Sequence, residues 1–163
     1  MSISPAPQPR IDYPDFTRAA GDAYKALIAL SKSVDDSGLE KPLTELVKLR
    51  ASQLNGCTFC LRLHLNIACK LGMAEDKLDM VAAWREAPVF SPRERAALAW
   101  TEALTHLGPE GVSDAAYAAL RQEFSETEAL FLTVTVGTIN QWNRIAVALR
   151  FAPPAAERRV AAA

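Results

Sequence analysis

The residues best suited to chemistry lie close together near the middle of the chain: Cys57, Cys60 and His64. At the ~100° per residue of an α-helix, all three fall on one largely apolar stripe, so we expect them to face the interior. The i, i+3 spacing of the cysteines brings their Cα atoms to about 5–6 Å, a distance that a disulfide can span. His64 follows one turn later, where an imidazole can take a thiol proton directly or through one water. Cys57 also stands near the expected helix start, where free N–H groups and the helix dipole favour a thiolate.

Two other interpretations of these residues remain open. Two cysteines and a histidine could supply three zinc ligands, but structural zinc sites generally take a second pair from a separate segment, and the chain has only 3 cysteines. Alternatively, buried cysteines and histidines can be ordinary packing residues. Three cysteines are too few, and odd in number, for an extracellular disulfide framework. In a reducing compartment, a Cys-x-x-Cys pair favours redox chemistry.

Glu45 is the candidate proton acceptor for this group. If the helices on either side of Asn55-Gly56 fold back antiparallel, Glu45 lies opposite residues 64–67. However, a helical wheel places it nearly opposite the apolar stripe that contains Leu43, Leu46 and Val47. The pattern alone therefore predicts an exposed glutamate.

The elements that must position these side chains are all predicted to be helices. Gly and Pro are sparse between residues 15 and 152, and Ala- and Leu-rich runs of helical period separate them. Ser91-Pro92 with Glu94, and Ser125 with Glu128, have the form of capping boxes, and Gly72 suits a left-handed C-terminal cap. A β-branched run at 133–136 has strand propensity but lies inside helical pattern. We predict an all-α domain with helices at about 15–34, 42–54, 57–72, 74–86, 91–108, 113–124 and 125–151.

The remaining composition limits organisation and location. We expect a single helical domain at 15–152, an extended arm at 1–14 and a flexible tail at 153–163, because prolines crowd both ends. The 163 residues carry 18 Lys and Arg against 19 Asp and Glu, which disfavours nucleic acid as a partner. No stretch approaches the ~18–20 apolar residues of a membrane span, and the first ten residues lack the apolar core of a signal peptide. We therefore expect a cytoplasmic protein without a membrane partner.

Taken together, these residues resemble a known family. Glu45, eleven residues, Cys57-Thr58-Phe59-Cys60, three residues and His64 form a pattern similar to the active-site motif of the AhpD-like alkylhydroperoxidases, within the carboxymuconolactone decarboxylase superfamily. Four further segments are similar to that family: Leu49–Gly56, Gly72, Phe90–Ala103 and Ile139–Arg144.

The resemblance implies an AhpD-like helical domain of about six to seven helices that assembles as a trimer or hexamer; a single motif favours a hexamer made of dimers. It implies a hydroperoxide reductase in which Cys60 attacks peroxide, Cys57 condenses with the resulting sulfenic acid, and an external dithiol or redox partner protein reduces the disulfide. Glu45 and His64 would form the proton relay. No cofactor and no bound metal are implied.

One position departs from the family pattern. Prototype members carry a second histidine directly before the second cysteine, where this chain has Phe59. Phe59 could form an apolar lip for an organic peroxide or a partner, or pack between subunits. Two alternative functions also remain: a lactone-acting lyase, which the wider superfamily includes, and a non-enzymatic protein that holds zinc or senses oxidation.

Overall fold

The computed structural model describes residues 8–157, and over that range it is entirely helical apart from loops and one isolated bridge between Gly108 and Gly111. This confirms the predicted all-α class. Eight α-helices and one 3-10 helix occupy these residues. In chain order they are α1 (Tyr13–Ala19), α2 (Gly21–Asp35), α3 (Lys41–Leu54), α4 (Thr58–Lys70), α5 (Glu75–Asp79), η1 (Val81–Ala83), α6 (Pro92–Thr105), α7 (Asp114–Arg121) and α8 (Glu126–Leu149).

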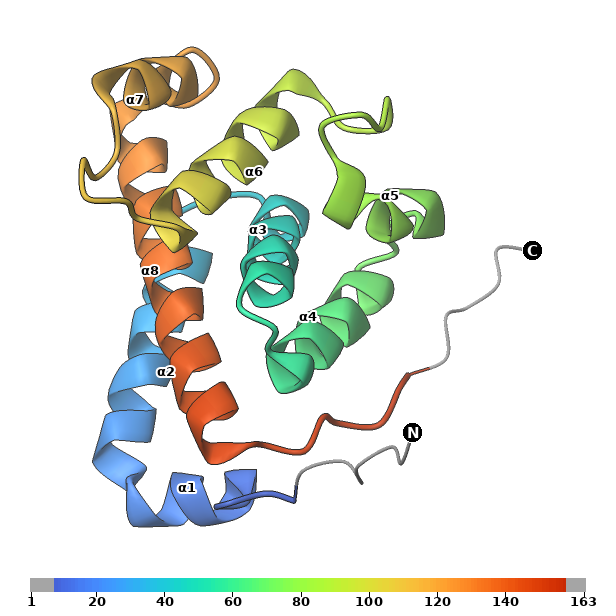
Figure 1. The fold of residues 1–163 in the computed structure, drawn as a ribbon, viewed down its shortest axis with the longest axis vertical. Helices are drawn as coiled ribbons and strands as arrows, with labels where there is room; N and C mark the ends of the chain where they lie inside the picture. The colour runs from blue at the N-terminus through green and yellow to red at the C-terminus, as the bar shows by residue number, and fades with distance from the viewer. Residues whose placement is uncertain (1–7, 158–163) are drawn as a thin grey trace.

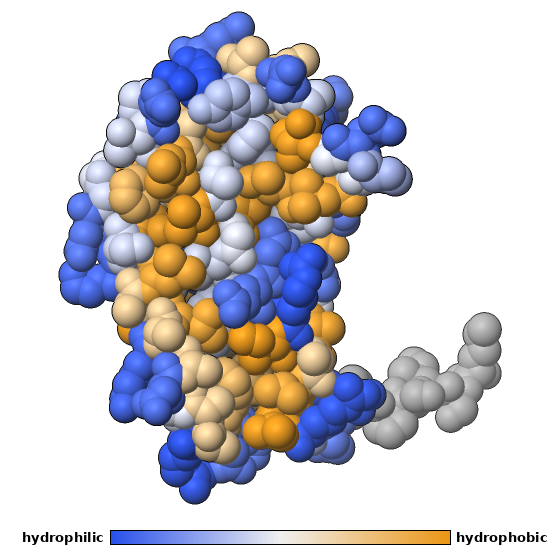
Figure 2. All heavy atoms as spheres, turned by 90° about the vertical axis from the view of Figure 1, so that its left-hand side faces the viewer, coloured by the Kyte–Doolittle hydropathy of each residue, from blue (hydrophilic) through white to orange (hydrophobic). Residues whose placement is uncertain are grey.

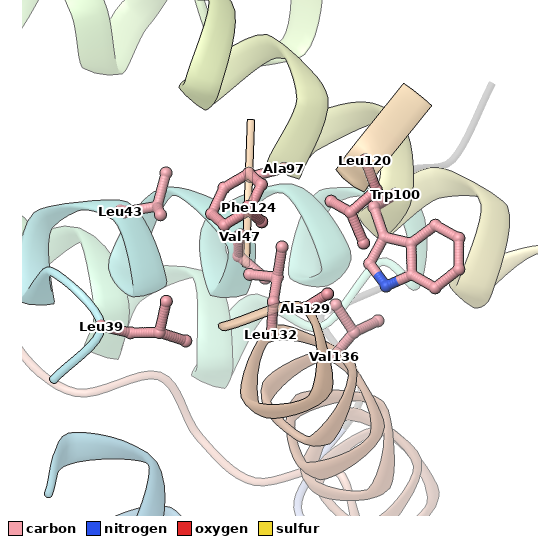
Figure 3. Close-up of a cluster of buried hydrophobic side chains, with 10 residues drawn as sticks. All are labelled: Leu39, Leu43, Val47, Ala97, Trp100, Leu120, Phe124, Ala129, Leu132 and Val136. Carbon is pink, nitrogen blue, oxygen red and sulfur yellow. The ribbon is translucent and has the colours of Figure 1, made fainter. Parts of the chain in front are cut away.

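Helix α3 is the central element of the bundle. It packs against α4, α6 and α8, and Figure 1 shows it enclosed by these helices, with the long α8 running the height of the molecule. One hydrophobic cluster joins α3 to α6, α7 and α8 through Val47, Trp100, Leu120 and Leu132 (Figure 3). A second cluster joins α3 and α4 to the α5–η1 segment through Leu46, Ala68 and Val81. Burial on several sides fixes the position of α3 relative to all its neighbours.

The predicted helix starts at Ser91 and Ser125 are confirmed in atomic detail. Each serine side chain accepts a hydrogen bond from the backbone N–H three residues later, and Glu94 and Glu128 each accept from the N–H of their serine. Both capping boxes satisfy backbone donors that a helix N-terminus otherwise leaves free. The β-branched run at 133–136 lies inside α8, where the Thr133 and Thr135 hydroxyls donate to carbonyls one turn back.

Two predicted helices are shorter than expected. The predicted helix at 15–34 is broken at Ala20, whose backbone (φ −110°, ψ 38°) leaves the helical region and separates α1 from α2. The predicted helix at 74–86 ends at Asp79 and continues only as η1. After η1, the Arg95 guanidinium donates to the carbonyl oxygens of Trp84 and Arg85, so these acceptors are satisfied without a further helical turn.

The segment after α8 folds back along α4. Asn66 on α4 is buried because its side-chain amide donates to the Ala155 carbonyl and accepts from the Glu157 N–H, at 2.9 and 3.2 Å. Lys70 pairs with Glu157 at 2.8 Å. The rest of the predicted tail, 158–163, and residues 1–7 of the predicted arm lie outside the described residues.

No helix of the described chain is long and apolar enough to cross a bilayer. The face that includes α7, α8, α2 and α1 nevertheless carries broad hydrophobic areas between hydrophilic ones (Figure 2). Large apolar side chains that are exposed on these helices include Ile28, Tyr117, Leu130 and Val147. Areas of this kind are typical of surfaces that meet another molecule.

Candidate active site

A helical hairpin brings the predicted site residues together. Helix α3 ends at Leu54, Gly56 turns the chain with φ +63°, and α4 begins at Thr58. Positive φ is a conformation that glycine adopts at little cost, which explains the Asn-Gly pair at the turn. Because α3 and α4 run back against each other, Glu45 on α3 reaches His64 on α4, nineteen positions away in the chain.

Cys57 is the N-cap of α4. Its Sγ accepts a hydrogen bond from the Cys60 backbone N–H at 3.2 Å, in the place that a serine hydroxyl takes at other helix starts. Both cysteines are free thiols, are nearly fully buried, and lie within one turn at the start of α4. The two thiols are therefore held close to each other at the helix start.

The two thiols differ in acidity. The pKa of Cys57 is lowered, first by the hydrogen bond from the Cys60 thiol and further by backbone N–H groups at the helix start and by Asn143. The pKa of Cys60 is raised, because its proton is engaged by Cys57 and because the site is desolvated. In the resting reduced site, negative charge is thus favoured on Cys57 and the proton on Cys60.

Glu45 is completely buried, so the prediction of an exposed glutamate is wrong. Its Oε2 lies 2.7 Å from His64 Nδ1, and its Oε1 accepts from Lys48 Nζ at 2.9 Å. Lys41 Nζ lies 3.5 Å from Oε1. The helical wheel failed because α3 is covered on its polar side as well as on its apolar side, by α4 and the end of α2. The interaction that the motif resemblance assigns to Glu45 is present within a single chain.

The surroundings keep Glu45 ionised. Burial would raise the pKa of its carboxyl, but the hydrogen bonds and charges of His64 and Lys48 outweigh burial and lower that pKa from 4.5 to about 2. Burial lowers the pKa of His64 below its ordinary value, although Glu45 acts in the opposite direction. At neutral pH the imidazole is therefore neutral, with Nδ1–H donating to Glu45 and Nε2 free to accept a proton.

A partly open cavity of about 170 Å³ adjoins this group. Cys60, His64 and Glu45 line it together with Lys41 and Lys48, whereas Cys57 does not. Its other walls are mainly apolar, and they include Tyr13, Ile28, Leu63 and Trp142. The volume lies below the roughly 300–1,000 Å³ typical of sites for drug-sized ligands, so the cavity suits a small reactant.

Phe59, which stands where prototypes have a second histidine, lines the cavity and packs within its own chain. Its ring is mostly buried and packs against Tyr13 and Phe151, with centroid distances of 5.0 and 5.4 Å. It also lines the cavity beside Cys60. The position therefore contributes an apolar wall rather than a proton carrier.

Asn143 on α8 belongs to the site but was not identified from the sequence. It is fully buried, its amide donates to Ser52 Oγ at 3.1 Å, and its carbonyl oxygen accepts from Asn55 at 2.9 Å. It also hydrogen-bonds the cysteine side chains. A detectable signal was present, since Asn143 lies at helical spacing on the buried stripe of α8 with Val136, Ile139 and Ala146.

The second histidine and the third cysteine of the chain lie elsewhere. His106 is the exposed C-cap of α6, and Cys69 is partly buried against the cluster of apolar side chains beside α5. Among residues 8–157, no group of three or more His, Cys, Asp or Glu side chains is arranged to hold a metal ion. The donor set needed for the zinc alternative is thus not assembled in this part of the chain.

The all-helical fold with a buried Cys-x-x-Cys, histidine and glutamate group defines a class of protein, and the comparisons agree with it. The carboxymuconolactone decarboxylase family model matches residues 15–103. The uncharacterized protein YdfG of Bacillus subtilis is 34% identical over 134 residues, which cover 82% of this chain and 91% of YdfG. The chain therefore belongs to the carboxymuconolactone decarboxylase family.

Two solved structures share this fold. A protein of unknown function from Agrobacterium tumefaciens, for which an AhpD-type antioxidant defence role has been suggested, superposes with a TM-score of 0.85 at 40% identity, over 91% of this chain and 99% of that one. An uncharacterized peroxidase-related protein from Ralstonia eutropha, with an alkylhydroperoxidase AhpD core, gives a TM-score of 0.76 at 24% identity. The superposition covers 86% of this chain and 75% of the Ralstonia protein, and it shows that the two share a fold.

Proposed function

We propose that this protein is a thiol-dependent hydroperoxide reductase that passes oxidising equivalents to an external dithiol. The observation that carries the proposal is the convergence of Cys60 with the His64–Glu45 pair on one small, largely apolar cavity, with a second thiol at the N-cap of the same helix. A neutral imidazole held by a buried carboxylate is a suitable general base for a thiol of raised pKa.

The first step uses Cys60. His64 Nε2 takes the Cys60 proton, and the thiolate attacks the terminal oxygen of the hydroperoxide, so that the O–O bond breaks. The leaving alkoxide receives the proton back from the imidazolium, which Glu45 stabilises. The products are a sulfenic acid on Cys60 and one molecule of alcohol.

The second step uses Cys57, whose pKa is already lowered by its neighbours. Its thiolate attacks the Cys60 sulfur, and the sulfenic hydroxyl leaves as water once it is protonated. The disulfide that forms is two electrons more oxidised than the two thiols, and an external dithiol reduces it to regenerate them. The acidities of the two thiols thus match their separate roles: the group that needs a base faces His64, and the group that is acidic without one does not.

Trapping the intermediate tests this assignment. In Cys57→Ser, one equivalent of an organic hydroperoxide should leave a sulfenic acid on Cys60, detected by dimedone labelling and peptide mapping. In Cys60→Ser, dithiol-dependent peroxide consumption should fall by more than about a hundredfold. Cys69→Ser, which removes the third cysteine, is the matched control and should keep wild-type activity. If the Cys60→Ser protein instead kept full turnover and dimedone labelled Cys57, then Cys57 would be the thiol that attacks peroxide. Full activity in a variant that lacks both Cys57 and Cys60 would favour the lyase.

A further inference from the structure

A second cavity opens on the other thiol. It has a volume of about 470 Å³ and is lined by Gly56, Cys57, Phe59, Val147, Arg150 and Phe151, among others. Within residues 8–157, Phe59 is the one lining residue that it shares with the cavity that contains Cys60 and His64. The Phe59 ring thus stands between two compartments, each of which has one of the two cysteines in its wall.

The second cavity differs from the first in size and charge. Its volume falls within the range of sites that hold larger organic molecules, whereas the cavity at Cys60 does not. Arg150 is the one charged side chain in its wall, and no carboxylate of the described chain lines it. An apolar site with a single cation suits an organic molecule that carries one acidic group.

Arg150 has two further properties that point to a ligand. No ion pair or side-chain hydrogen bond engages its guanidinium within the described range, although most other arginines there are engaged. Its backbone is left-handed, with φ +59°, at the C-cap of α8, a position that glycine commonly takes. A large cation held in a conformation that L-residues disfavour, with no partner inside the chain, suggests a function outside the chain.

We propose that this cavity binds the reductant, a low-molecular-weight thiol bearing a carboxylate, and delivers it to the sulfur of Cys57. The proposal rests on the proposed function, because it concerns the disulfide which that reaction forms. The carboxylate pairs with Arg150 while the thiolate attacks Cys57 Sγ. The Cys57–Cys60 bond then breaks, and the Cys60 sulfur leaves and takes a proton from the His64 side.

A mixed disulfide between the reductant and Cys57 results. A second thiol group, on the same or another reductant molecule, attacks the reductant sulfur and releases Cys57 as a thiolate. The oxidised product is the disulfide of the reductant, so two electrons reach the protein, with one proton on Cys60 and Cys57 left as a thiolate. The acidity of Cys57 assists this release, because thiols of low pKa are the better leaving groups. Oxidant and reductant therefore enter from different sides.

The test begins from protein oxidised with diamide, so it does not depend on peroxide activity. Reduction is followed with 3-mercaptopropionate and with 2-mercaptoethanol, and rates are compared at equal thiolate concentration. The wild type should react faster with the carboxylate-bearing thiol, and the preference should shrink at high salt. In Arg150→Gln it should fall roughly three- to fivefold, and Arg150→Lys should restore most of it. An unchanged preference in Arg150→Gln would overturn the proposal and leave the peroxidase assignment standing.

Two further measurements locate the attack. Acid quenching after 3-mercaptopropionate, followed by alkylation and mapping, should find the mixed disulfide on Cys57; a mixed disulfide on Cys60 would refute the proposed route. Val147→Trp should slow reduction by both thiols and leave the oxidation of reduced protein by peroxide unchanged. Leu130→Trp on the same helix, equally exposed but outside both cavities, is the control and should alter neither rate. Equal slowing of oxidation and reduction by Val147→Trp would contradict separate entrances.

Discussion

Replacing Glu45 with glutamine is the sharpest test of how the buried pair works. Glutamine keeps the size of the side chain and can still accept the hydrogen bond from His64 Nδ1, which lies 2.7 Å from the carboxylate. What it removes is the negative charge that stabilises the imidazolium formed when His64 takes a proton. The substitution therefore separates the charge of Glu45 from its packing.

The structure allows the size of the effect to be worked out. A hydrogen bond to a charged partner contributes about 1.5–3 kcal/mol, against about 0.5–1.5 kcal/mol for a neutral one. The imidazolium therefore loses about 1–2 kcal/mol of stabilisation, which corresponds to a roughly 5–30-fold slower oxidation step. Lys48 also loses its charged partner, but its ammonium group can turn towards the cavity mouth.

The pH profile distinguishes a charge effect from a structural one. In the wild type, His64 acts in its neutral form, so the rate of oxidation falls as the pH drops through the pKa of His64, which burial places below about 6.5. Without the carboxylate that pKa falls further. The acid limb of the Glu45→Gln profile should therefore lie about one pH unit lower, although the plateau rate is reduced.

Single-turnover oxidation of the reduced protein, followed by the fluorescence of Trp142 in the cavity wall, measures both quantities. Glu40→Gln is the matched control, because Glu40 precedes the same helix and pairs with Arg93 but lies outside this cavity. A plateau rate within twofold of the wild type, or an acid limb that moves to higher pH, would refute a charge role for Glu45.

Three other outcomes follow from the structure. The free energy of unfolding in urea should decline as the pH falls below about 6.5, because His64 gains a proton in the unfolded chain that the buried ring resists. It should fall by about a further 3 kcal/mol between pH 4.5 and 2, as Glu45 is protonated. If Glu45→Gln lost the same amount of stability over that range, the loss would belong to another group. Asn143→Leu should lower the free energy of unfolding in urea by about 1–3 kcal/mol, because it leaves Ser52 and Asn55 without their hydrogen-bond partner. It should also slow iodoacetamide labelling of Cys57 at pH 7, because it removes a donor that lowers the pKa of that thiol. Unchanged labelling would confine Asn143 to a structural role. Light scattering should give the mass of a trimer or a hexamer, because of the exposed apolar side chains on α2, α7 and α8, and a monomer at micromolar concentration would contradict this.

Local signals in the sequence predicted much of the fold. The two capping boxes and the helical spacing of Cys57, Cys60 and His64 depend on neighbours within one or two turns, and the structure confirms them. The features that could not be predicted depend on groups distant in the chain. The Arg95 guanidinium satisfies the carbonyls of Trp84 and Arg85 after η1, and the carbonyl of Ala155 accepts a hydrogen bond from Asn66. Periodicity contains no information about such partners.

Glu45 shows most clearly where pattern reasoning stopped. A helical wheel separates polar from apolar faces, and Lys41, Glu45 and Lys48 do form one polar face of α3. A polar face, however, is exposed only if nothing packs on it, and here α4 brings His64 against it. Charges of opposite sign at i, i+4 and i+7 can satisfy one another away from water, so such a stripe can be buried where an isolated carboxylate could not. His64 and Lys48 are thus what allows an ionised glutamate to occupy a buried position, and a carboxylate held against an imidazole is the arrangement that a proton relay needs.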